Sequence, residues 1–66
     1  MKVGSVVKLN QGVYNHFGLE SCTAVLVEKI PRKDSLEYDW LVLTDGRFIE
    51  LGRQIEQSAE LISEGW

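Results

Sequence analysis

The stretch LVLTDGRFIEL, residues 41–51, constrains the fold more than any other part of the chain. Two arms rich in apolar residues flank Asp45-Gly46, a pair suited to the positive φ angles of a type I′ turn. The stretch therefore predicts a β-hairpin with a two-residue loop. If Asp45 and Gly46 are the central turn residues, the register is fixed, and the predicted cross-strand pairs are Thr44–Arg47, Leu43–Phe48, Val42–Ile49, Leu41–Glu50 and Trp40–Leu51.

Directly opposed residues share a face of a hairpin, so this register predicts apolar side chains on both faces. One face is apolar throughout and is expected to point into the core: Trp40, Val42, Ile49 and Leu51. We expect it to be joined there by Val3, Val7, Leu9 and members of the 24–27 run. The other face also carries three apolar side chains, with Asp39 and Glu50 at its edge: Leu41, Leu43 and Phe48.

The chain is too short to explain that second face by a large core. At 66 residues it forms one domain, and a chain of this length buries only about 60% of its unfolded surface. A single cysteine, Cys22, excludes an internal disulfide, and one histidine with one cysteine cannot complete a zinc site without acidic ligands at a recognisable spacing. Self-association is the remaining source of extra stability, although a compact barrel of this size can also fold alone.

Two explanations of the second face follow. In the first, the C-terminal segment 59–66 or the loop that carries Tyr14 and Phe17 folds over it. In the second, Leu41, Leu43 and Phe48 form a binding face, most simply for another copy of the chain, because contiguous exposed apolar patches usually mark interaction sites. The thin core favours a homo-oligomer.

The rest of the chain has the pattern of a small all-β protein, without repeats or linkers. Residues 2–9 alternate as a strand, and residues 10–22 keep no period and predict a long first loop. The remaining predicted elements are strands at 23–30, 37–43, 47–51 and 59–63, a turn at 31–35, and a short helical or 3₁₀ turn within 52–58. We therefore expect one domain, 1–66, a five-stranded small β-barrel that is closed or partly open.

This layout resembles the SH3-like small barrels, in which a long loop follows strand one and a 3₁₀ turn precedes strand five. The opening KVGSVVKL is similar to the V-G-D-x-V start of such barrels, including many short proteins of tailed bacteriophages, with Ser5 in place of Asp. The resemblance implies a non-enzymatic accessory protein that works by binding, in the cytoplasm of the host cell or in the virion.

The same five-stranded order also resembles Sm-like RNA-binding rings. The R-G step of the second Sm motif is missing here, since the hairpin reads DGRF. An Sm-like oligomer that binds RNA or single-stranded DNA is therefore the alternative.

Charge argues against strong binding to nucleic acid. Seven Lys and Arg against ten Asp and Glu give a net charge of −3, the wrong sign for a protein held mainly by phosphate contacts. A local site would combine cations with aromatic side chains that stack on bases. The candidate contacts are Lys8, Tyr14, His16, Phe17, Arg47 and Arg53. The aromatic residues among them could equally form a small cluster that orders the first loop.

No catalytic arrangement can be assembled from the sequence. His16 and Cys22 lie in or beside the first loop without an orienting third group, and Glu37 and Asp39 belong to a charged rim. The glycines do not form a phosphate-binding loop. We therefore predict no enzyme, catalytic residue, cofactor, metal or small-molecule substrate. No apolar run approaches the roughly 18 residues of a membrane span, so we expect no membrane association.

Overall fold

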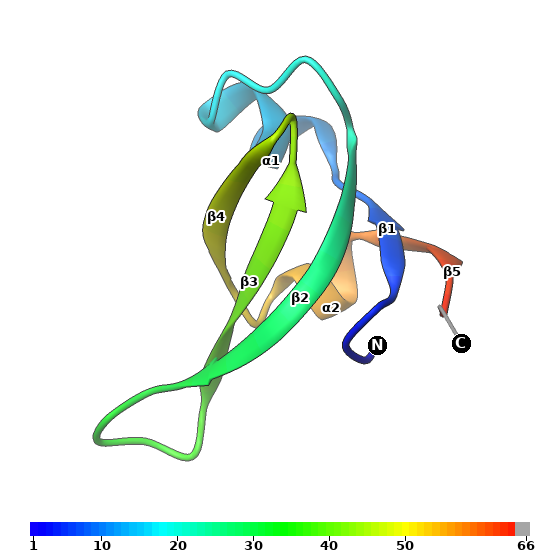
Figure 1. The fold of residues 1–66 in the computed structure, drawn as a ribbon. Coiled ribbons are helices and arrows are strands. Elements are labelled where there is room, and N and C mark those ends of the chain that lie inside the picture. The colour runs from blue at the N-terminus through cyan, green and yellow to red at the C-terminus, as the bar shows by residue number, and fades with distance from the viewer. Residues whose placement is uncertain (65–66) are drawn as a thin grey trace.

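The computed structural model describes residues 1–64 and consists mainly of one antiparallel sheet (Figure 1). The five strands are arranged in the order β4-β3-β2-β1-β5. The elements are β1 Val6–Lys8, α1 Gln11–His16, β2 Thr23–Pro31, β3 Tyr38–Thr44, β4 Arg47–Gly52, α2 Ile55–Ser58 and β5 Glu60–Ser63. The expected sequence of five strands, with a short helix before the last, is confirmed.

The β3–β4 hairpin has the predicted register at every pair. Asp45 and Gly46 both have positive φ, 54° and 69°, as a type I′ turn requires. Trp40, Val42 and Leu51 are buried, and Ile49 is half-buried against the same core. The assignment of this face to the core is therefore confirmed.

The core draws on β1 to β4 and on α2, together with Leu9 just after β1 and Leu19 after α1. It consists of Val7, Leu9, Leu19, Ala24, Leu26, Trp40, Val42, Leu51 and Ile55. The prediction that Val3 belongs to it is wrong, because Val3 is 58% exposed. The alternation of residues 2–9 breaks at Gly4, whose φ is 93°, and β1 begins only at Val6. Ser5 is buried instead and accepts a hydrogen bond from the backbone N–H of Lys2 at 3.0 Å.

The first loop is more ordered than predicted, because six of its residues form α1. The Asn10 side chain caps the helix by accepting from the Val13 N–H at 2.9 Å. The helix ends in a Schellman motif, with Gly18 at φ 64°, the Gly18 N–H on the Asn15 carbonyl and the Leu19 N–H on the Tyr14 carbonyl. This ending directs Leu19 into the core.

Candidate interaction surface

The face of the sheet opposite the core exposes apolar side chains on β3 and β4. Leu43 is 38% exposed and Phe48 is 64% exposed, while Leu41 is half-buried between Glu28 and Glu50. Through residue 64, the C-terminal segment does not cover them: β5 pairs with β1, at the other end of the sheet. Residues 65 and 66 of that segment lie outside the described residues. We call this side of the sheet the outer face.

The outer face is larger than the sequence indicated, because strand pairing extends it to β2 and β1. Leu43 lies opposite Val25, which is 37% exposed, and Val25 lies opposite the half-buried Val6. The four strands thus align one apolar residue each: Val6, Val25, Leu43 and Phe48. We call this line the apolar row. Finding it required the order of the strands, which the alternation within each strand does not give.

Charged residues of opposite sign border the apolar row. On one side, two residues further along β1, lies Lys8, which pairs with Thr23. On the other side Leu41 lies between Glu28 on β2 and Glu50 on β4. Among residues 1–64 none of these three charged groups makes an ion pair within its own chain, although Glu60 on β5 lies opposite Lys8. The outer face is therefore an apolar line between a basic and an acidic border.

Both outermost strands also have an edge without a strand partner in the described part of the chain. Within residues 1–64, β4 pairs only with β3, and β5 pairs only with β1. On β5, Leu61 and Ile62 are 40% and 54% exposed. An unpaired strand edge offers backbone donors and acceptors to another chain.

The predicted nucleic-acid contacts are only partly brought together. The Arg47 guanidinium donates to the Phe17 carbonyl at 3.2 Å, and the His16 and Phe17 rings meet edge to face with centroids 4.9 Å apart. Lys8 and Tyr14 line a separate depression beside the start of α1. Arg53 lies over the Tyr38 ring, with 5.9 Å between its guanidinium carbon and the ring centroid. Only His16, Phe17 and Arg47 therefore form one cluster, which we call the corner cluster.

A carboxylate on α2 forms a polar centre that the sequence analysis missed. One oxygen of Glu56, Oε2, accepts from the Tyr38 hydroxyl at 2.5 Å and from the Trp40 indole N–H at 2.8 Å. The Lys29 ammonium lies over the rings of both aromatic residues. Burial raises the pKa of Glu56, but the two hydrogen bonds, together with the positive charges of the N-terminus and Lys29, outweigh it and the pKa is lowered. These bonds fix α2 to β3, and no local sequence signal connects residues so far apart.

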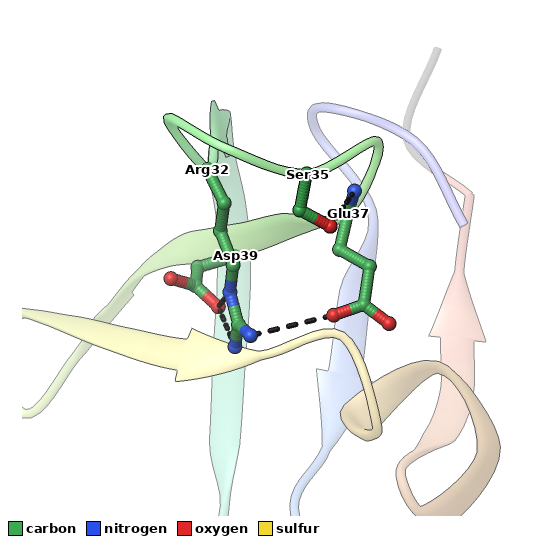
Figure 2. Close-up of polar contacts among 4 residues, drawn as sticks. All are labelled: Arg32, Ser35, Glu37 and Asp39. Carbon is green, nitrogen blue, oxygen red and sulfur yellow. Dashed lines mark hydrogen bonds and ion pairs between the residues drawn. The ribbon is translucent and has the colours of Figure 1, made fainter.

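The carboxylates of Glu37 and Asp39 share one cation. Figure 2 shows Arg32 reaching both across the β2–β3 turn. Its guanidinium donates to Asp39 from Nε at 3.1 Å and from Nη2 at 2.8 Å, and to Glu37 from Nη1 at 3.4 Å. The Ser35 hydroxyl accepts from the Glu37 N–H at 3.0 Å. These contacts close the turn, and we call the group the Arg32 clasp.

Residues 1–64 contain no group of three or more His, Cys, Asp or Glu side chains placed to hold a metal ion. None of the helices described is long and apolar enough to cross a membrane. His16 is exposed in the corner cluster and Cys22 is half-buried just before β2.

The chain matches no protein-family model, and neither the curated proteins nor the solved structures contain a significant match to it.

Proposed function

We propose that the protein is a non-enzymatic binding module of the SH3-like small-barrel type, which associates with itself through the outer face of its sheet. The observation that carries the proposal is the exposed apolar row, above all Phe48 and Leu43. Apolar groups that line up across four strands, three of them exposed, form a contiguous patch, which marks an interaction site more strongly than scattered residues do. The strand order and the short helix before β5 support the barrel type. Its assignment as a phage accessory protein, in the host cell or the virion, rests on the resemblance of its opening residues.

The energetics are compatible with association of modest strength. Burying a large apolar side chain contributes about 1.5 to 3 kcal/mol at most, and association costs roughly 4 to 15 kcal/mol. Two copies of the apolar row can exceed the lower part of that cost. We therefore expect an assembly that depends on protein concentration.

Light scattering over a range of protein concentrations tests the proposal. The wild type is expected to exceed the mass of one chain as concentration rises, and Leu43→Lys is expected to return it to one chain. Gln11→Lys adds the same charge on the exposed side of α1 and serves as the control. A wild type that keeps the mass of one chain at every concentration contradicts the proposal.

The corner cluster supports a second candidate function, the binding of RNA or single-stranded DNA as in an Sm-like module. Phe17 is 37% exposed, and the Arg47 guanidinium is bound to its backbone carbonyl. An aromatic ring next to a cation can stack on a base and contact a phosphate. A labelled oligonucleotide titrated at several salt concentrations tests this. Binding that weakens steeply with salt and is lost in Phe17→Ala is expected, and no binding at low salt excludes this function.

A further inference from the structure

We infer that the self-contact is a two-fold, face-to-face dimer in which Lys8 of each copy pairs with Glu28 of the other. The inference rests on the proposed function and specifies its partner, a second copy, and its geometry. It follows from the order of charges around the apolar row. Lys8 borders the row on one side and Glu28 borders it on the other.

The two borders are equally far from the row. Lys8 is two residues from Val6, a separation of about 7 Å along a strand. Glu28 is three residues from Val25 in sequence, but a bulge lies between them, and Glu28 pairs with Leu41, two residues from Leu43. The basic border and the acidic border are therefore displaced from the row by similar distances in opposite directions.

Only one of the two simple two-fold arrangements uses these charges favourably. A two-fold axis parallel to the apolar row places the row of one copy against the row of the other. It also exchanges the two borders, so that the basic border of one copy faces the acidic border of the other. A two-fold axis parallel to the strands instead places each border opposite the same border of the partner. The acidic residues Glu28 and Glu50 of one copy then face those of the other. Like charges across an interface are unfavourable, so the charge pattern selects the axis along the row.

The side chains have the reach that this arrangement needs. Stacked sheets lie about 10 Å apart and neighbouring strands about 4.8 Å apart, distances that an extended lysine and glutamate can bridge together. Lys8 and Glu28 are exposed, and neither makes an ion pair within residues 1–64. Glu60, opposite Lys8 on the neighbouring strand, can share the same ammonium group. Two-fold symmetry forms the Lys8–Glu28 contact twice.

Charge-reversed variants test the inference, because the two changes complement each other only between chains. In Lys8→Glu alone both residues of the proposed pair are acidic, and in Glu28→Lys alone both are basic. Each variant alone is expected to dimerise about tenfold more weakly than the wild type at low salt. An equimolar mixture is expected to recover the wild-type affinity as a heterodimer, which native mass spectrometry identifies by its mass when one of the two variants carries a uniform heavy-isotope label. Lys33→Glu, with the same charge change on the β2–β3 turn, is the control and should dimerise as the wild type does.

The outcomes separate this inference from the proposed function. If the wild type associates but neither reversal weakens it, or the mixture remains as weak as the separate variants, the face-to-face pairing is wrong and self-association stands. If the wild type is monomeric throughout, the proposed function falls and this inference with it. Because Lys8 and Glu28 are exposed, all the variants should unfold at the same urea concentration as the wild type.

Discussion

Trp40 and Glu56 are joined by a 2.8 Å hydrogen bond from the indole N–H to a carboxylate oxygen that also accepts from Tyr38. Trp40 is fully buried, so its N–H needs a partner, and only this carboxylate is bonded to it in the described chain. One ionised group on a four-residue helix therefore satisfies a buried donor on β3 and holds the helix against the sheet.

This arrangement predicts how stability depends on pH. Because the pKa of Glu56 is lowered in the folded protein, this group stabilises the fold fully above its ordinary pKa of 4.5. That stabilisation is lost as the pH falls through the lowered pKa. The hydrogen bond to Glu56, together with burial, raises the pKa of Tyr38. Protonated Tyr38 therefore stabilises the fold fully below its ordinary pKa of 10.0, and this stabilisation is lost as the pH rises through the raised pKa. Urea unfolding of the wild type and Glu56→Gln between pH 3 and pH 7 should show the larger loss on acidification in the wild type. Equal slopes would contradict the assignment.

A lysine should unfold the protein on one face of the hairpin and leave it folded on the other. Val42 is fully buried, so Val42→Lys places an unpaired charge in the core and is expected to unfold the protein. Leu43→Lys, one residue later on the outer face, is expected to retain the fold and lose only self-association. Circular dichroism and urea unfolding distinguish the two. If Leu43→Lys unfolds the chain as well, the outer face is part of the core.

Replacing each of the two glycines of the α1 region by alanine should change the stability of the protein in opposite directions. Gly18 has a φ of 64°, so Gly18→Ala should destabilise the protein by about 1 kcal/mol even though the space around it is open. Gly12 lies within the helix, and an added Cβ would meet only the Asn10 Oδ1 atom at 3.4 Å. Gly12→Ala should therefore stabilise by up to about 1 kcal/mol. Thermal unfolding of both variants provides the measurement, and a stabilising Gly18→Ala would refute the Schellman ending.

Replacing His16 or Cys22 by alanine should leave self-association unchanged, because neither residue lies on the outer face. His16→Ala removes an exposed ring, and Cys22→Ala removes one half-buried sulfur. Light scattering of both variants should match the wild type. A loss of some assayed activity, in a variant whose circular dichroism is unchanged, would instead support a catalytic role.

Local patterns predicted the parts of the fold that depend on local chemistry. Asp45-Gly46 was sufficient to fix the hairpin register, since few residue pairs tolerate two consecutive positive φ angles. The helix α1 was missed because it has no buried residue and so no apolar period, although Asn10 and Gly18 marked both of its ends. Val3 was misplaced because alternation alone cannot show where a strand begins.

Contacts between distant segments were beyond sequence reasoning. The carboxylate of Glu56 meets Tyr38 and Trp40 only because α2 folds back on β3, and the three residues share no local pattern. The apolar row likewise exists only once β1 is known to lie beside β2. Leu43 and Phe48 were identified from the hairpin itself, whereas Val6 and Val25 required the pairing of neighbouring strands.

The Arg32 clasp spans the turn at residues 32–37, which makes this turn a suitable attachment point for a probe. In Figure 1 this turn projects from the rest of the molecule, and Leu36 within it is fully exposed. A fluorophore coupled to Leu36→Cys in a Cys22→Ala background would sit on a closed turn, away from both the apolar row and the corner cluster. Labelled chains could then report assembly by energy transfer without altering either candidate surface.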